Sequence, residues 1–306
     1  MQKQSLKKII LITAKAFFSG LLLTYLLRKI DLQALAGHFR EMNGWFFFLS
    51  ALTTFSVTFI TAVRWWVLLG RNHQLGKLLS LTLIGGFFNN LLPGAVGGDA
   101  VKAYYLYLET QQGGRSIASV FMDRYIGYLG LLTIGLVSGA IAFNELAAVH
   151  MQWITPLLFI AFLVGSLAVF GLRIGRRFAA LADFYDFFHD TLRNRRVALT
   201  AFALSLCTQL LTILSIYLIT RAVGQRPPFT ALFVFVPIVI TVMMIPISIS
   251  GLGLRESAFV LLFGLSGIPA EASTTISLLW FLSVAIVSLV GLVEYVRFKK
   301  GPGSAL

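Results

Sequence analysis

Four charged side chains follow two breaks in an otherwise apolar sequence. Asp99 and Lys102 come directly after the first break, and Arg255 and Glu256 come directly after the second. Charge within a long apolar segment is costly, so such residues are usually paired or functional. We expect the two basic side chains to hold an anion such as phosphate, while the two carboxylates balance them or carry a coupling proton.

Both breaks have the same composition and the same neighbours. Each consists of an apolar stretch, a proline, several glycines and then an acidic residue near the start of a second apolar stretch. The free N–H groups at the start of a helix bind anions, and glycine lets a ligand approach the backbone closely. The predicted anion site contains Asn89, Asn90, Pro93, Gly94, Gly97, Gly98, Asp99 and Lys102 from the first break, and Pro246, Gly251, Gly253, Arg255 and Glu256 from the second.

Three further charged residues, Arg64, Asp123 and Arg124, lie inside predicted spans and complete the candidate site. Each stands close enough to a span end to reach the interface, so snorkelling and a functional role are equally open. Arg255 and Glu256 are adjacent, and successive side chains on a helix point in different directions, so we expect each to pair with another element. Structural ion pairs that only fix the breaks in place are the alternative to ligand binding.

The rest of the chain determines where these residues lie. Hydrophobic residues make up 58% of its 306 residues, and charged residues only 12%, against about a quarter in a soluble domain. Apolar blocks of about 20 residues, enough to cross a bilayer, recur from end to end. We predict an all-α polytopic fold and one membrane domain, residues 1–306. Its six full spans are 9–27, 45–69, 117–143, 153–172, 197–220 and 273–296.

The two breaks lie within the broken apolar regions 78–108 and 229–265. Pieces of this length are marginal as spans, and non-helical backbone survives at membrane depth only where it is buried in protein or lines a wet cavity. We therefore predict two re-entrant hairpins or broken helices in an inverted-repeat-like arrangement, which is typical of transporters and of their substrate sites. The alternative is that proline and glycine only kink ordinary membrane helices.

The distribution of Lys and Arg predicts the orientation. If each broken region returns to the side it entered from, most of these residues lie on the side of the N-terminus, so we expect both termini in the cytoplasm and the protein in the cell membrane. Apolar residues at helical spacing predict an amphipathic helix over 177–192 in the cytoplasmic interface. The net charge of +13 then reflects basic loops beside anionic lipid, and no nucleic acid partner is expected.

No cofactor, metal site or catalytic residue is expected. The single cysteine, Cys207, excludes an intrachain disulfide, and the four histidines are too far apart for a ligand motif. The sequence contains no Walker-type loop, so intrinsic ATP hydrolysis is not expected. No nucleophile stands beside a base at a recognisable spacing, although a carboxylate pair formed by Asp99 and Asp123 stays open.

The two breaks together resemble the lysylphosphatidylglycerol synthase transmembrane family, also called flippase-like membrane proteins. The similarity covers nearly the whole chain and is carried by residues 89–99, Arg64-Trp65-Trp66, Asp123-Arg124 and 246–256. The resemblance implies a domain that translocates lipid. In two-domain relatives the lipid is an aminoacylated phospholipid made by an attached soluble synthase. We expect this chain to be a stand-alone member that lacks the synthase, so lysyl transfer is not expected and the lipid is left open.

Three functions follow from these observations. The leading hypothesis is a flippase-like protein that translocates an anionic phospholipid or a polyprenyl-phosphate-linked lipid. The second is a membrane enzyme that acts on lipid-linked sugars. The third is a non-transporting subunit that docks a separate cytoplasmic or membrane lipid-modifying enzyme, with residues 173–196 as the docking segment.

Overall fold

The computed structural model describes residues 24, 31–91, 97–171, 179–245 and 251–299. These residues form helices joined by short turns, and none of them lies in a strand. The predicted first span, 9–27, lies outside the described residues except for residue 24. The other predicted elements can be compared with the structure one by one.

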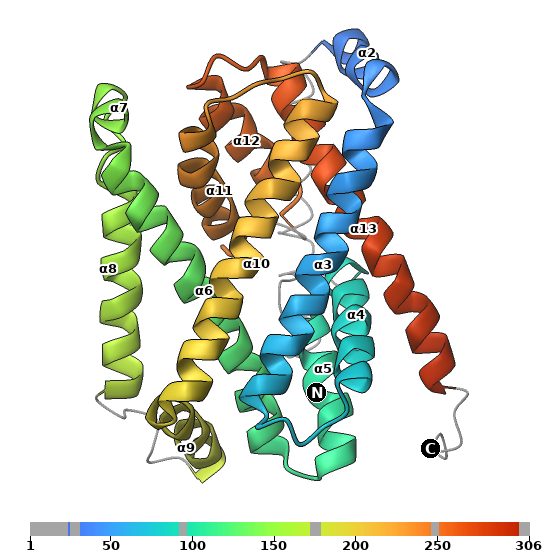
Figure 1. Cartoon of the computed structure of the whole chain (residues 1–306), viewed down its shortest axis with the longest axis vertical. Coiled ribbons are helices and arrows are strands. Elements are labelled where there is room, and N and C mark those ends of the chain that lie inside the picture. The colour runs from blue at the N-terminus through green and yellow to red at the C-terminus, as the bar shows by residue number, and fades with distance from the viewer. Residues whose placement is uncertain (1–23, 25–30, 92–96, 172–178, 246–250, 300–306) are drawn as a thin grey trace, which may run out of the picture.

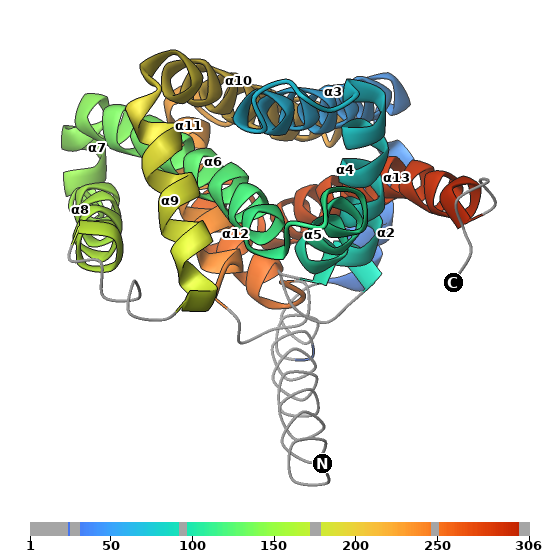
Figure 2. The same cartoon turned by 90° about the horizontal axis from the view of Figure 1, so that it is seen from below.

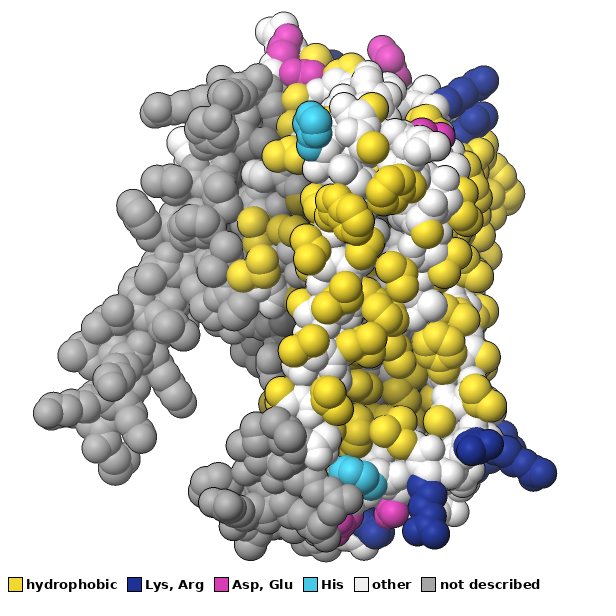
Figure 3. Space-filling view, turned by 90° about the vertical axis from the view of Figure 1, so that its left-hand side faces the viewer, with side chains coloured by type: hydrophobic (Ala, Val, Ile, Leu, Met, Phe, Trp, Pro, Cys, Tyr) yellow, Lys and Arg dark blue, Asp and Glu magenta, His cyan; other side chains and the backbone are white. Residues whose placement is uncertain are grey.

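Five described helices are long and apolar enough to cross a bilayer. They are α3 (Gly44–Leu68), α6 (Gly113–Ile141), α8 (Ile154–Ser166) with the π-helix η1 (Leu167–Gly171), α10 (Arg195–Ala222) and α13 (Ala270–Lys299). Each coincides with one of the predicted spans after the first. Figure 3 shows a broad band of hydrophobic side chains with charged side chains gathered at its two ends. The expected all-α polytopic membrane fold is confirmed.

Four shorter helices form two re-entrant hairpins. In Figure 1, α4 (Leu75–Leu91) and α5 (Gly97–Thr110) occupy only the lower half of the molecule, and α11 (Phe229–Met243) and α12 (Leu254–Gly264) only the upper half. Helices of 11 to 17 residues are about 16–26 Å long, less than the ~30 Å of a hydrocarbon core. Each pair therefore leaves by the end through which it entered, and the two pairs enter from opposite ends.

The helices form an inverted repeat. The order α2 (Leu32–Glu41), α3, α4, α5, α6 recurs as α9 (Ala179–Arg193), α10, α11, α12, α13, and α2 and α9 lie at opposite ends of the molecule (Figure 1). We call these ends the α2 end and the α9 end. Packing partners correspond as well: α4 packs on α13 as α11 packs on α6, and α2 packs on α13 as α9 packs on α6. The helices α3 and α10, which correspond to each other, pack side by side.

The predicted interfacial helix over 177–192 corresponds to α9, which runs across the end of the molecule that faces the viewer in Figure 2. Its aromatic face is buried: the Phe188 ring stacks on Phe170, with 3.7 Å between centroids, and Tyr185 is buried beside them. Asp186 and Asp190 are exposed. The aromatic face of α9 therefore packs on the protein itself. At the α2 end, the short helix α7 (Phe143–Ala148) follows α6.

Glycines allow the hairpins to pack at backbone distance. In the first hairpin, a Cβ atom on Gly98 would lie 1.8 Å from the carbonyl oxygen of Gly85. Between the repeats, a Cβ atom on Gly291 of α13 would lie 2.0 Å from the carbonyl oxygen of Leu83 in α4. No side chain fits at either crossing, so these glycines position α4 against both of its neighbours.

A charged cluster closes the base of the first hairpin at the α9 end. The Glu109 carboxylate of α5 lies 2.9 Å from the Lys77 ammonium of α4 and 3.5 Å from His73. Partial burial alone would raise the pKa of Glu109, but the hydrogen bonds and positive charge of Lys77 and His73 outweigh it and hold this pKa below its usual value. The contribution of this cluster to stability is therefore present near neutral pH and is lost as the pH falls through the folded-state pKa.

The glycine crossing in the first hairpin can be tested by adding a single methyl group. Gly98→Ala should destabilise the protein by about 1–3 kcal/mol, because the added carbon overlaps the Gly85 carbonyl. Gly86→Ala, in the same hairpin, has no atom within 4 Å of the added carbon and should be neutral or slightly stabilising through helix propensity. Thermal unfolding of the purified variants in detergent measures both. Equal melting temperatures for the two variants would contradict the close crossing.

Candidate functional site

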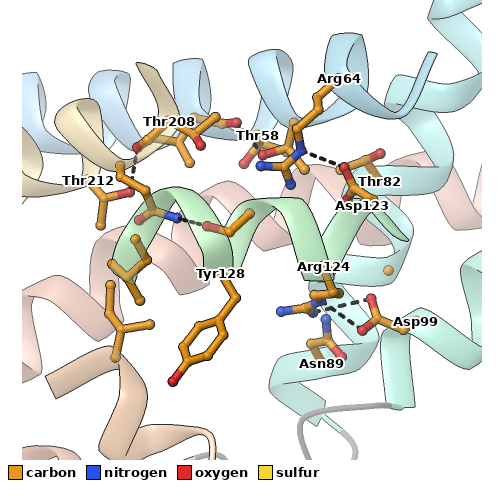
Figure 4. Close-up of a pocket in the computed structure, with 18 of the residues that line it drawn as sticks. Thr58, Arg64, Thr82, Asn89, Asp99, Asp123, Arg124, Tyr128, Thr208 and Thr212 are labelled. Atoms are coloured by element: carbon orange, nitrogen blue, oxygen red, sulfur yellow. Dashed lines mark hydrogen bonds and ion pairs between the residues drawn. The ribbon is translucent and has the colours of Figure 1, made fainter. Parts of the chain in front are cut away.

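A polar cavity of about 290 Å³ lies between the α4–α5 hairpin and the helices α3, α6, α10 and α11 (Figure 4). Hydroxyl groups line it, contributed by Thr58, Thr61, Thr82, Thr208, Thr212 and Tyr128. It also brings together six predicted site residues: Arg64, Asn89, Asp99, Lys102, Asp123 and Arg124. Of these charged residues three are basic and two acidic, so the formal charge of the cavity is 3 − 2 = +1.

Arg64 and Asp123 form the buried ion pair of the cavity. The Arg64 Nε atom donates to Asp123 Oδ1 over 2.7 Å, and Nη1 donates to Ser205 of α10 over 2.9 Å. Gly127 makes room for the guanidinium, since a Cβ atom there would lie 3.0 Å from Nη1. Both charged side chains are buried, so neither reaches an interface by snorkelling. The pair joins α3, α6 and α10 at one point.

Lys102 lies beside the same carboxylate, Asp123. It is only 5% exposed, its Nζ atom lies 3.7 Å from Asp123 Oδ2, and it lies 4.3 Å from the centroid of the Trp65 ring. Its stem packs against Gly85. Its Nζ atom makes no hydrogen bond to another described residue, although an ammonium carries three donors. A buried ammonium that faces a polar cavity in this state is suited to bind an anion.

Asp99 and Arg124 form a second, more exposed pair. The Arg124 Nε and Nη2 atoms donate to the two Asp99 carboxylate oxygens over 2.8 and 3.2 Å. The Arg124 side chain is 50% exposed, whereas that of Asp99 is 14% exposed. Figure 4 shows the pair on the side of the cavity opposite Arg64. Snorkelling is therefore not needed to explain Arg124, because its charge is satisfied within the site.

The helix N-termini expected to bind an anion already have partners. The Gly98 N–H group at the start of α5 donates to Asn89 Oδ1 over 2.8 Å. At the start of α12, the Gly253 N–H group donates to Glu256 Oε2 over 2.7 Å. A side chain thus satisfies one backbone donor at the start of each helix.

Arg255 and Glu256, which follow the second break, form a buried ion pair and are not among the residues that line the cavity. We expected Arg255 and Glu256 to pair with other elements, and this prediction is wrong: they pair with each other, with Arg255 Nε 3.0 Å from Glu256 Oε1. Glu256 turns back to cap its own helix, which brings its free oxygen beside Arg255. Ser277 and the Phe281 ring of α13 enclose the guanidinium. Arg255 is 2% exposed and Glu256 0% exposed, so the pair is enclosed by protein, as expected for a structural ion pair.

Comparison with known sequences identifies the family. Residues 11–291 match the lysylphosphatidylglycerol synthase TM region. The chain belongs to the lysylphosphatidylglycerol synthase transmembrane family. The resemblance expected from the two breaks is thereby confirmed. A UPF0104 membrane protein of Methanothermobacter thermautotrophicus (strain Delta H) is 26% identical over 258 residues, which cover 72% of this chain and 74% of that protein.

The remaining predicted site residues of this family member lie away from the cavity or outside the described residues. Gly251 and Gly253 have φ angles of +77° and +79°, a conformation that favours glycine, so they serve the turn into α12. Asn90 has a buried Nδ2 atom without a hydrogen-bond partner among the described residues. Gly97 begins α5. The prolines and one glycine, namely Pro93, Gly94 and Pro246, lie outside the described residues.

Sequence reasoning missed the neutral polar residues of the site. Thr58 and Thr61 of α3 face the cavity together with Thr208, Gln209 and Thr212 of α10. Their spacing of three and four residues was the available signal, because it places each pair on one helix face. The signal is weak, since threonines in membrane helices commonly donate to their own backbone, as all four of these do.

The sealed pair in α12 predicts a stability defect that is separate from ligand binding. Glu256→Gln leaves Arg255 buried without a counter-charge, which should cost about 3–5 kcal/mol. Glu145→Gln, at an exposed position in α7, removes the same charge and should stay within about 0.5 kcal/mol of the wild type. Thermal or chemical unfolding in detergent gives the comparison. Equal stability of the two variants would show that the pair contributes nothing to folding.

Proposed function

We propose that this protein translocates a lipid with an anionic, phosphate-containing headgroup, and that the headgroup passes through the polar cavity. The observation that carries the proposal is Lys102, a buried residue that lines the cavity and whose ammonium makes no hydrogen bond to another described residue. Burial of such a group is costly unless a ligand completes its coordination. A phosphodiester offers the acceptors and the single negative charge that would bring the +1 cavity to neutrality.

The inverted repeat supports transport. Transporters built this way bind their substrate near mid-depth, between broken helices that enter from opposite ends, and rock one repeat against the other. Here α4, α5 and the end of α11 all contribute to the cavity, so both hairpins contact it. The hydroxyl groups of the cavity threonines already donate to backbone carbonyl groups, so their oxygen atoms provide further neutral acceptors for a polyol or sugar part of the headgroup, together with the Gln209 side chain. Phospholipids and polyprenyl-phosphate-linked lipids share the chemistry that this site recognises.

We further propose a role without catalysis. Each carboxylate of the possible acid–base pair has its own cation: Asp123 lies beside Arg64 and Lys102, and Asp99 accepts two bonds from Arg124. Each carboxylate thus already serves as a counter-ion within the site. Docking of a separate lipid-modifying enzyme on the segment 173–196 stays a prediction, and deletion of α9 tests it.

The orientation proposed for the cell membrane places the α9 end in the cytoplasm. The helices that begin or end there carry Lys77, Arg115, Arg193, Arg195 and Arg196. Short basic segments are retained on the cytoplasmic side of membranes. Under this orientation the α4–α5 hairpin, with the cavity at its tip, enters from the cytoplasm.

Replacement of Lys102 tests the proposed function directly. Lys102→Met keeps the stem that packs against Gly85 but removes the ammonium. The variant loses a charge-assisted hydrogen bond to the phosphate, worth about 1.5–3 kcal/mol. We therefore expect translocation to be about 10- to 100-fold slower. The assay follows fluorescent phosphatidylglycerol in phosphatidylcholine–phosphatidylglycerol proteoliposomes. Lys102→Arg should retain part of the rate.

Lys77→Met is the matched control, because it removes the same group from the partly exposed base of the hairpin. Its translocation rate should stay within about twofold of the wild type. Folding of each variant is checked by gel filtration and by thermal unfolding. A folded Lys102→Met protein that translocates phosphatidylglycerol at the wild-type rate would refute the headgroup site.

A further inference from the structure

An apolar groove of about 720 Å³ lies between α5 and α6. Its walls include Ala100 and Tyr104 from α5 and Ile117 and Phe121 from α6. The last three are 49%, 61% and 40% exposed, so the groove opens to the lipid-facing surface. Apolar walls of this kind at a membrane surface suit a hydrocarbon chain.

The groove and the polar cavity share three lining residues: Asp99, Arg124 and Met244. The Asp99–Arg124 ion pair therefore stands at the junction between an apolar compartment and a polar one. A lipid is the kind of molecule whose two parts match such adjoining compartments. A water-soluble anion would use the cavity alone.

The dimensions of the groove match one leaflet. Along α6 it extends from Arg124 back to Gly113, and along α5 from Asp99 to Tyr107. At 1.5 Å per residue these stretches are about 16 and 12 Å long, close to half of a ~30 Å hydrocarbon core. The groove therefore runs from the cavity, at mid-depth, to the α9 end.

The direction of the groove determines how a lipid bound there would be oriented. The cavity residues of α6, such as Gly127, Tyr128 and Leu131, lie farther towards the α2 end than the groove residues. A lipid with its phosphate in the cavity and a chain in the groove has its headgroup towards the α2 end. That is the orientation of lipids in the leaflet at the α2 end.

The ion pair at the junction is suited to open. Arg124 is half exposed and Asp99 is its internal counter-ion, whereas the Arg64–Asp123 pair is nearly completely buried. A phosphate that replaces the Asp99 carboxylate would offer Arg124 the same kind of oxygen acceptors and the same sign of charge. The phosphate would then bridge Arg124 and Lys102.

We propose that the α5–α6 groove holds a hydrocarbon chain of the lipid whose phosphate occupies the cavity, and that Asp99 is an internal anion that this phosphate displaces from Arg124. The proposal rests on the proposed function. Its two parts make separate predictions, one for variants that fill the groove and one for the removal of the internal anion.

Tryptophan substitutions test the groove. Ala100→Trp fills it near the junction and Ile117→Trp fills it near the α9 end, and both positions are exposed, so neither disturbs a packed core. Binding of dioleoylphosphatidylglycerol in detergent micelles is compared with binding of glycerophosphoglycerol, the same headgroup without chains. Both variants should weaken lipid binding at least tenfold and change headgroup binding less than threefold.

Ala161→Trp, at an exposed position of α8, is the control and should bind both ligands as the wild type does. If Ala100→Trp and Ile117→Trp bind the lipid normally while Lys102→Met loses both ligands, the groove is not a chain site and the proposed function stands. If the two tryptophans weaken headgroup and lipid equally, the groove proposal is also wrong. If Lys102→Met loses neither ligand, the proposed function fails as well.

Removal of the internal anion tests the role of Asp99. Asp99→Asn keeps the size and a hydrogen-bond acceptor but frees the charge of Arg124, so glycerophosphoglycerol should bind at least fivefold more tightly. A purely structural Asp99 would give unchanged or weaker binding, and either result would overturn the displacement. The matched variant Glu145→Gln, far from the cavity at the α2 end, should leave the affinity unchanged.

Discussion

One buried carboxylate makes the rest of the site possible. Asp123 accepts from Arg64 and lies beside Lys102, so a single anion compensates cations from two other helices. Either cation alone at this depth would be prohibitively costly. Because Arg64 also donates to Ser205, the carboxylate indirectly ties α10 to α3, α5 and α6. The cavity exists because these four helices converge on charge that none of them could bury alone.

In both repeats a side chain caps the helix that begins at membrane depth, but the repeats differ in which charged side chains remain free to line a cavity. Each hairpin has a helix that starts at membrane depth, where free N–H groups need partners. Asn89 caps α5 and Glu256 caps α12 from side chains of the hairpin itself. In the second repeat Glu256 then neutralises Arg255, and the pair is sealed. In the first repeat a neutral amide is the cap, so Asp99 and Lys102 stay available to the cavity.

The spans and the breaks could be predicted from sequence, because apolar length and glycine–proline composition are local properties. The entry of the hairpins from opposite ends followed from the odd number of predicted spans between the two broken regions, and the structure has the same arrangement. Partners could not be predicted, because Arg64 and Asp123 are 59 positions apart and meet only through helix packing. The pairing of Arg255 with Glu256 was missed for another reason: in the first turn of a helix, capping redirects side chains that would otherwise diverge.

The charge arrangement also fits a site that must release what it binds. A cavity with unpaired cations would hold a phosphate too tightly to pass it on, and an uncharged cavity could not draw one out of water. Here Arg64 is satisfied by Asp123, Arg124 is satisfied by Asp99, and Lys102 is only partly compensated at 3.7 Å. Entry of a phosphate, as we propose, would replace existing contacts, and its departure would restore them. Binding that is strong enough to admit a charge yet weak enough to free it is the requirement for passage through a membrane protein.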